Sequence, residues 1–144
     1  MDIVSKKTRS KMMASVRSRN TKPEIMVRSL LHRLGYRFRL HRKDLPGNPD
    51  IVLSRYKKII FVHGCFWHQH QGCSKSNRPD TRPEFWNKKL NENIERDKVI
   101  IRQLQDAGWT VHVIWECQTK KGEQRLLYVI KEIFSYNGDQ GTDN

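Results

Sequence analysis

The sequence of 144 residues has no apolar run near the ~18 residues of a membrane span, which excludes a transmembrane protein. Its first twenty residues also lack the apolar segment of a secretory signal, so we expect a cytoplasmic protein. Cysteine is scarce as well. Three cysteines are too few, and an odd number, for a disulfide framework, and they favour metal ligation or burial instead.

Acidic residues are few, and their scarcity is uneven. The chain carries 28 Lys and Arg against 15 Asp and Glu, a net charge of +13. Residues 1–43 hold 13 basic residues and only two acidic ones, so this segment alone carries +11. A solvated basic face is the simpler interpretation, but so local a bias is typical of a protein that binds a polyanion. Nucleic acid is favoured over a membrane, because no amphipathic lipid-facing stripe accompanies the charge.

Hydrophobic periodicity divides the chain into helices and strands, and the length is typical of one domain. Thr-x-x-Glu sequences at Thr21 and Thr81 predict capping boxes at the starts of two helices. The order of elements predicts an α/β domain with a mixed central sheet flanked by helices. In chain order we expect a helix over 21–34, strands over 36–40, 50–53 and 58–63, a loop over 64–82, a helix over 83–107, a strand over 109–115 and a helix over 126–134.

The two ends differ from this central domain, which we expect over 21–136. Residues 1–20 are basic and have too few apolar residues to pack firmly, so we expect an arm that contacts DNA. Residues 137–144 are polar and predict a disordered tail.

Four residues of metal-binding type follow the strands over 58–63 and 109–115. Cys65, His70 and Cys73 lie in the long loop, and Cys117 comes just after the second strand. If the two strands are neighbours, their ends bring all four together. Three thiolates and an imidazole would form a closed tetrahedral site that suits zinc. Buried cysteines beside a surface histidine are the simpler alternative.

A second group of polar residues suggests catalysis. Asp50 begins a strand and suits a hard cation such as Mg²⁺, although a turn Asp is commoner. His63 and His68 could act as a general base, unless His68 rather than His70 binds the zinc. Glu24 could orient a histidine, but its capping box explains it equally well. Asp97 lies on the apolar spacing of the long helix, which predicts either an ion pair (with Arg28 or Arg96) or a role in the site.

Aromatic residues accompany the expected metal loop. Phe66 and Trp67 lie where little core is available, and Trp86 is in the first turn of the next helix. In a basic protein such side chains can wedge between base steps of DNA. Core packing is the alternative, and we accept it for Trp109 and Trp115.

These residues stand in strings that resemble the very-short-patch repair (Vsr) endonuclease family, over nearly the whole of residues 8–134. The run from His63 to His68 is the most specific. The strings are Thr8-Arg9-Ser10-Lys11 with Met13, Leu45-Pro46-Gly47-x-Pro49-Asp50, Phe61-x-His63-Gly64-Cys65-Phe66-Trp67-His68, Thr81-Arg82-x-Glu84-Phe85-Trp86, Asn93-x-Glu95-Arg96-Asp97 and Trp115-Glu116-Cys117.

The resemblance implies a restriction-endonuclease-like fold and a Mg²⁺-dependent enzyme. Such an enzyme nicks one strand on the 5′ side of the thymine in a T·G mismatch, which arises when 5-methylcytosine deaminates. The implied setting is a bacterial cytoplasm, in association with the nucleoid. The implied partners are mismatched double-stranded DNA and a MutL-type repair protein, and single-strand nicking suits a monomer.

The resemblance also implies a role for each residue. Asp50 and the main-chain carbonyl of Val62, which replaces a Thr of better-known relatives, would hold Mg²⁺. His68 would be the general base, oriented by Glu24, and His63 would touch the scissile phosphate. The remaining implied residues are the zinc ligands Cys65, His70, Cys73 and Cys117, the wedge residues Phe66, Trp67 and Trp86, and the arm residues Arg9, Lys11, Arg17 and Arg19.

Two other functions remain open from the sequence. A non-catalytic, zinc-stabilised DNA-binding module would explain the charge, the cysteines and the aromatic residues. A sequence-specific restriction-type nuclease that cuts intact duplex would also explain Asp50 and the histidines. Metal-dependent nicking would distinguish an enzyme from the non-catalytic module. Cleavage of matched DNA compared with T·G DNA would distinguish a mismatch endonuclease from a restriction-type nuclease.

Overall fold

The structure is a computed structural model that describes residues 20–135. The expected tail over 137–144 and the expected arm, with Arg9, Lys11, Arg17 and Arg19, lie outside the described residues. Within residues 20–135 no helix is long and apolar enough to cross a membrane.

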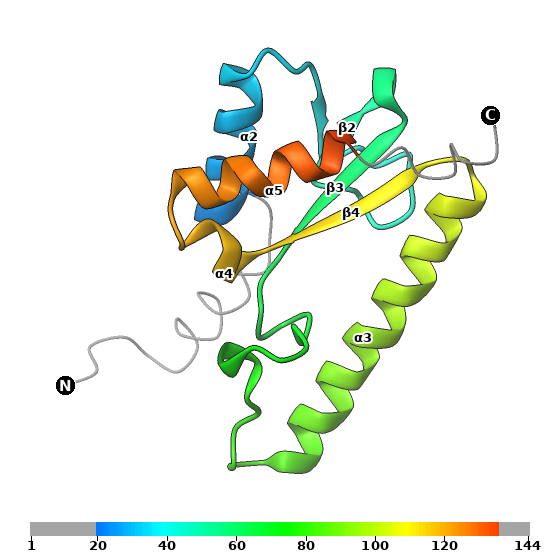
Figure 1. Ribbon diagram of the computed structural model, residues 1–144. Helices are drawn as coiled ribbons and strands as arrows, with labels where there is room; N and C mark the ends of the chain where they lie inside the picture. Colours follow the sequence, from blue (N-terminus) through cyan, green and yellow to red (C-terminus); the bar gives the residue numbers. More distant parts are fainter. Residues whose placement is uncertain (1–19, 136–144) are drawn as a thin grey trace.

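A four-stranded sheet forms the centre of the domain (Figure 1), in the order β1-β2-β3-β4. The strand β2 is antiparallel to both of its neighbours, β1 and β3, whereas β3 and β4 run parallel. The prediction of a mixed sheet is therefore confirmed. The strands are β1 (Arg39–Leu40), β2 (Ile51–Leu53), β3 (Lys58–His63) and β4 (Thr110–Trp115).

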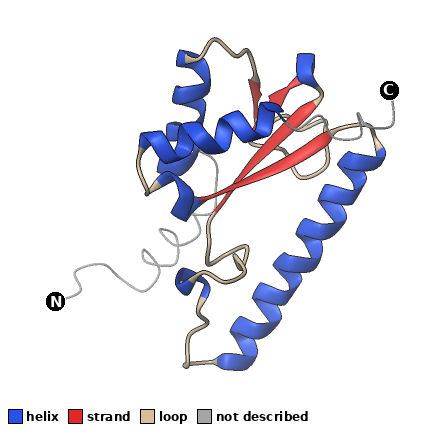
Figure 2. Cartoon of the chain, viewed as in Figure 1, coloured by secondary structure: helices blue, strands red, loops and turns tan. Residues whose placement is uncertain are grey.

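Helices cover both faces of this sheet (Figure 2), and each face has its own core. One core joins α2 and α5 to the sheet through residues such as Leu31, Ile60 and Ile130. The other joins α3 to the sheet through Leu104, Ile59 and Phe61. Because successive side chains of a strand point to opposite faces, Ile60 and Phe61 serve different cores. The helices are α2 (Lys22–Arg33), α3 (Pro83–Asp106), α4 (Glu116–Thr119) and α5 (Glu123–Ser135).

The two predicted capping boxes have different outcomes. At α2, the Thr21 side chain accepts a hydrogen bond from the Glu24 backbone N–H at 3.3 Å, as expected, although Glu24 reaches back to Asn20 instead of Thr21. At α3 the prediction is wrong. Arg82 is the N-cap there, in a left-handed conformation with no side-chain cap bond. Pro83 begins the helix without an N–H to satisfy, so a cap is less needed.

Two other differences concern short elements. The strand expected over 36–40 is reduced to Arg39–Leu40, because Tyr36 instead stacks on Phe134 with ring centroids 3.9 Å apart. The four-residue helix α4 was not predicted, since it has no full turn of apolar spacing to reveal it.

The loop between β1 and β2 approaches α3 closely at Gly47. This residue has a φ of +77°, and a Cβ placed on it would lie only 2.5 Å from Cγ2 of Ile100. Glycine is required here both by the backbone conformation and by the close approach. The loop thereby closes one wall of a cleft beside Asp50.

Candidate active site and metal centre

The parallel pairing of β3 with β4 determines where the functional residues gather. His63, the last residue of β3, lies opposite Trp115, the last residue of β4. The chain continues from these two ends into the 64–82 loop and into α4. Residues that are far apart in the sequence therefore meet at one end of the sheet.

The Cys and His residues expected to bind metal do come together at this end. The donor atoms of Cys65, His70, Cys73 and Cys117 all lie within 4.8 Å of one another. Nδ1 of His70 is 3.7 Å from Sγ of Cys65 and 3.4 Å from Sγ of Cys117. His70 is thus the histidine of this group, as its spacing indicated, and His68 is not part of it.

The surroundings of these thiols suit a bound cation. Cys65 is fully buried, and burial raises the pKa of its thiol to about 12. At Cys73 the pKa is lowered, first by a hydrogen bond from the Lys75 backbone N–H. A bound divalent cation would offset the cost of burying a negatively charged thiolate at Cys65, because coordination deprotonates thiols. Three sulfurs and one imidazole nitrogen form a closed four-donor set of the kind that structural metal sites have.

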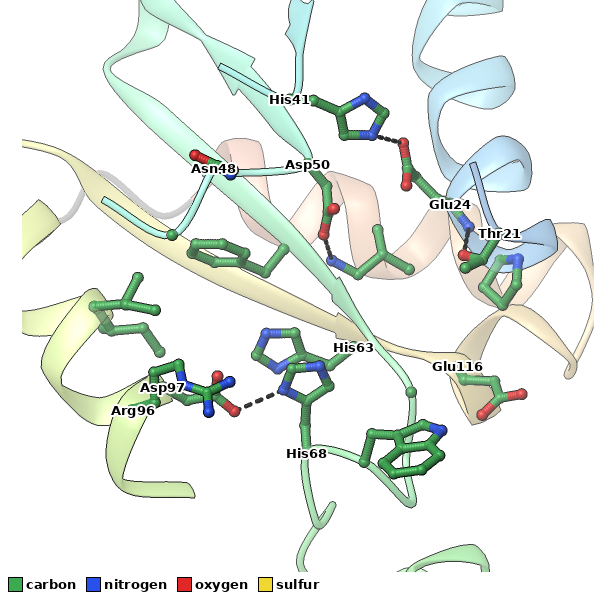
Figure 3. A pocket seen from close by; sticks show the side chains of 18 of the residues that line it. Thr21, Glu24, His41, Asn48, Asp50, His63, His68, Arg96, Asp97 and Glu116 are labelled. Atoms are coloured by element: carbon green, nitrogen blue, oxygen red, sulfur yellow. Dashed lines mark hydrogen bonds and ion pairs between the residues drawn. The ribbon is translucent and has the colours of Figure 1, made fainter. Parts of the chain in front are cut away.

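Beside this metal centre lies an open cleft of about 910 Å³. Its walls come from the start of α2, the 41–50 loop, the end of β3, the first residues of the 64–82 loop and the middle of α3 (Figure 3). Basic residues at its edge include Lys43 and Arg96. The cleft thus combines carboxylates that could bind a cation with basic residues that could contact a phosphate backbone.

Asp50 lies in this cleft, directly before β2. Its Oδ2 accepts a hydrogen bond of 2.8 Å from the backbone N–H of Val62. Burial raises the pKa of its carboxyl group to about 6, although the Val62 hydrogen bond opposes the shift. A buried carboxylate of this kind binds a cation readily, since the cation replaces the lost hydration.

His63 and His68 line the same cleft and lie ring on ring. Their centroids are 3.7 Å apart and the planes are inclined by 6°. Burial lowers the pKa of His63 to about 3, helped by the nearby His68, so His63 is neutral at physiological pH. Nδ1 of His68 is 2.7 Å from Oδ2 of Asp97 on α3. Asp97 therefore belongs to the site, and neither Arg28 nor Arg96 is its partner in an ion pair among the described residues.

Glu24, which we expected to orient His68, does not contact it in the part of the chain that the structure describes. Glu24 is only 2% exposed, and its Oε2 lies 2.6 Å from Nε2 of His41 and 3.1 Å from the Arg28 guanidinium. Glu24 projects from α2, whereas His68 lies on the loop that faces α3 (Figure 3), so the two contact different neighbours. Glu24, His41 and Asp50 instead form a second group with donor atoms within 4.8 Å.

His41 and the partnership of Asp97 with His68 are the features that the sequence did not reveal. His41 is in a loop with no periodic pattern, and its only signal was its residue type. Asp97 did give a signal, because a carboxylate on an apolar helix face needs a partner. The identity of that partner, 29 residues away, depended on how the loop folds.

The aromatic residues form one cluster at the N-terminal end of α3. Phe66 lies edge-on to both Trp67 and Trp86, with ring centroids 5.1 and 5.4 Å apart. Phe85, which the sequence analysis did not single out, contacts Trp86 at 5.1 Å and is 44% exposed. Phe66, Trp67 and Trp86 are half-buried and only Phe85 is exposed, so this is a partly exposed aromatic cluster next to the cleft.

Comparison with known proteins agrees with this site. A family model described as "DNA mismatch endonuclease Vsr" matches residues 1–75. The chain is 44% identical over 125 residues to the DNA mismatch endonuclease Vsr of Escherichia coli K12, which covers 87% of this chain and 79% of the relative.

Other relatives are named as nicking enzymes. The type II nicking enzyme V.XorIIP of Xanthomonas oryzae is 50% identical over 117 residues, which cover 81% of this chain and 85% of the relative. V.NmeAIP of Neisseria meningitidis is 41% identical over 135 residues, which cover 92% of this chain and 96% of the relative. With carboxylates and histidines gathered in one cleft, and with matches along most of its length, the chain belongs to the Vsr family of DNA mismatch endonucleases.

Proposed function

We propose that this endonuclease nicks one strand of duplex DNA on the 5′ side of the thymine in a T·G mismatch. Such mismatches arise from deaminated 5-methylcytosine, and the nick would initiate very-short-patch repair. The observation that carries the proposal is the convergence of Asp50, His63 and the His68–Asp97 pair in one cleft. We also infer a restriction-endonuclease-like fold, since a carboxylate at the start of the β2–β3 hairpin and a parallel β4 are present.

Asp50 and Val62 would hold the catalytic cation. In an extended strand, the N–H and C=O of one residue point towards the same neighbouring strand. Because the Val62 N–H points at the Asp50 carboxylate, the Val62 carbonyl also lies on the Asp50 side of β3. Oxygen donors of this kind suit Mg²⁺. When bound, Mg²⁺ would neutralise charge on the phosphate and on the leaving 3′ oxygen.

His68 would act as the general base. Its Nδ1 faces Asp97, which leaves Nε2 to accept a proton from the attacking water. Asp97 would hold the imidazole in the required tautomer and stabilise its positive charge after proton transfer. His63 stays neutral and is stacked on His68, so one of its ring nitrogens carries a hydrogen that can be donated to the scissile phosphate.

The group of Cys65, His70, Cys73 and Cys117 would hold a structural zinc. Sulfur donors favour zinc over magnesium, and a closed set leaves no position for a catalytic water. The metal would fix the 64–82 loop, in which only Cys65 is buried. His68 would thereby be held near Asp50.

Phe66, Trp67 and Trp86 would wedge into the duplex beside the mismatch, since they form a partly exposed cluster next to the cleft. Arg9, Lys11, Arg17 and Arg19 would contact phosphates through the arm. We propose that the enzyme acts as a monomer in a bacterial cytoplasm, where it would associate with the nucleoid. A MutL-type repair protein is the proposed further partner, and no membrane is involved.

A strand-resolved cleavage assay tests the proposal. Duplexes with one T·G pair, and the matched duplexes, carry a different label on each strand and are incubated with Mg²⁺ or with a chelator. We expect one nick, 5′ of the mismatched thymine and only with Mg²⁺. Equal cutting of matched duplex would instead favour a restriction-type nuclease, and binding without any cleavage would favour a non-catalytic module.

Variants connect the activity to the site. Asp50→Ala and His68→Ala should abolish nicking while leaving binding of T·G duplex largely intact. The matched controls are Asp106→Ala and His32→Ala, which alter exposed side chains outside the cleft. Undiminished nicking by either active-site variant would refute its assigned role.

A further inference from the structure

The 64–82 loop carries Phe66 and Trp67 of the aromatic cluster but has little core of its own. Cys65 is its only buried residue, and its only regular element is the short turn Ser74–Ser76. A metal bound by Cys65, His70, Cys73 and Cys117 would hold the part of the loop near the first three of these residues. Phe66 and Trp67 lie on the side of the loop that faces α3, so another contact must keep them there.

Arg78 makes this contact. Its guanidinium donates three hydrogen bonds to three side-chain amides, from Nε to Gln69 at 2.9 Å, to Asn87 at 2.8 Å and to Asn91 at 2.9 Å. Asn87 and Asn91 are one turn apart on α3 and therefore share a face of that helix. Arg78 thus links the end of the loop to α3 and to the middle of the loop at the same time.

Gln69 extends this link to the aromatic cluster. Its Nε2 donates to the main-chain oxygen of Phe66 at 2.7 Å and to that of Ser76 at 3.1 Å. On the other side of the cluster, Nδ2 of Asn93 donates to the main-chain oxygen of Trp67 at 3.0 Å. The backbone of both aromatic residues is consequently held by side chains that are themselves fixed on α3 or by Arg78.

We propose that Arg78 is a positioning residue for the aromatic wedge, and that it acts through Gln69, Asn87 and Asn91. By holding Phe66, whose ring contacts both Trp67 and Trp86, in place before DNA arrives, this network would remove the cost of ordering the loop during binding. It would therefore determine the affinity for mismatched DNA and not the rate of the chemical step. The inference rests on the wedge role proposed above.

The chemistry of the network distinguishes it from an ordinary basic contact. A guanidinium has five N–H donors in a fixed planar arrangement, and here three of them meet three acceptors. A lysine ammonium has the same charge but cannot span acceptors on three sides. Arg78→Lys therefore removes the geometry and keeps the charge, whereas Asn87→Ala/Asn91→Ala removes two acceptors and leaves Arg78 itself intact.

The experiment measures Kd for T·G and for matched duplex, and the nicking rate at saturating DNA, in the full chain. For both variants we expect Kd for T·G duplex to rise about tenfold, as for a lost charged hydrogen bond. The rate at saturation, the Kd for matched duplex and the salt dependence of binding should stay the same. Arg102→Lys and Gln103→Ala, at exposed positions of α3, are the matched controls.

A measurement on the free protein makes the network testable without DNA. Acrylamide quenching of tryptophan fluorescence should increase in both variants, because Trp67 and Trp86 would become more accessible. Zinc content, measured on the same samples, should not change, since none of the four metal-binding residues contacts Arg78.

Each other result would overturn the proposal. Normal Kd in Arg78→Lys would show that only the charge matters, and normal Kd in the Asn double variant would show that Arg78 contacts DNA directly. A loss of zinc would assign the network to the metal centre. The wedge itself is tested separately by Trp67→Ala. Normal binding of T·G duplex by that variant would refute the proposed wedge role of Trp67. Unchanged acrylamide quenching in Arg78→Lys would refute the positioning role of Arg78.

Discussion

The two groups of ligand residues at the end of the sheet differ in their donor atoms and in the way they are held. The active-site group has carboxylate oxygens and imidazoles on strand ends and α3, around an open cleft of about 910 Å³. The metal centre has three sulfurs and one imidazole, mostly on an irregular loop. The first group is positioned largely by the sheet and lines an open cleft, whereas the second would complete the coordination of a bound metal and so position the loop.

Burial has the same electrostatic effect in both groups. It raises the pKa of Asp50 to about 6 and that of Cys65 to about 12. Burial thus disfavours the Asp50 carboxylate and the Cys65 thiolate, and a bound cation would stabilise either anion. The difference lies in access, because a cation beside Asp50 is open to substrate, while one beside Cys65 is enclosed by four protein donors. In the proposed function, the same effect of burial would serve reaction in one place and structure in the other.

The strongest way to break this comparison is to remove Asp50. We expect Asp50→Ala to lower the nicking rate by about 1,000-fold or more, because the charge stabilisation by the metal would be lost. The thermal unfolding temperature should not fall, since a buried charge with a raised pKa has been removed. Single-turnover nicking and thermal unfolding of the same sample measure both effects. A marked drop in stability with retained nicking would reverse the two roles.

Removing a ligand from the metal centre should instead affect stability more than chemistry. Cys117→Ser, or removal of the proposed zinc by a chelator, should decrease the free energy of unfolding by about 3 kcal/mol or more, because metal binding at such sites is coupled to folding. Proteolysis should then begin within the 64–82 loop. Urea unfolding and mass spectrometry of the first fragments test this. Cleavage that begins elsewhere would show that the metal does not hold this loop.

A smaller effect is expected at Asp97. Asp97→Asn keeps the shape of the side chain but removes the charge beside His68, and we expect the nicking rate at saturating DNA to fall about 10- to 100-fold. Affinity for T·G duplex should be unaffected. Asp106→Asn, near the end of the same helix, is the control. A change in Kd alone would place Asp97 in DNA binding instead of catalysis.

The smallest effect concerns stability and pH. Because the folded state raises the pKa of Asp50 from its ordinary value near 4 to about 6, the neutral form is favoured on folding. The associated stability is present below about pH 4 and is lost as the pH rises through about 6. In a chelator, Asp50→Asn should therefore gain about 1–2 kcal/mol over the wild type between pH 4 and pH 7. A pH-independent difference in urea unfolding would contradict this.

The sequence predicted those parts of the site that depend on local pattern. The apolar strand that ends at His63 and the spacing of Cys65, His70 and Cys73 were sufficient to place the metal group, once β3 and β4 were neighbours. Side-chain partners were harder to predict. The rotation of α2 and α3 about their axes decides that Glu24 meets His41 and that Asp97 meets His68, and hydrophobic periodicity does not define rotation so finely.

The close approach at Gly47 has a consequence for the reacting groups. Three residues later the same loop delivers Asp50, and the helix it touches at Ile100 carries Asp97, which holds His68. A methyl group at this glycine would push the two segments apart and widen the gap between the proposed cation ligand and the proposed base. Misplacement by about 1 Å can slow a reaction about 100-fold. The absence of a side chain at Gly47 therefore helps to set the distance between the proposed cation ligand Asp50 and the proposed base His68.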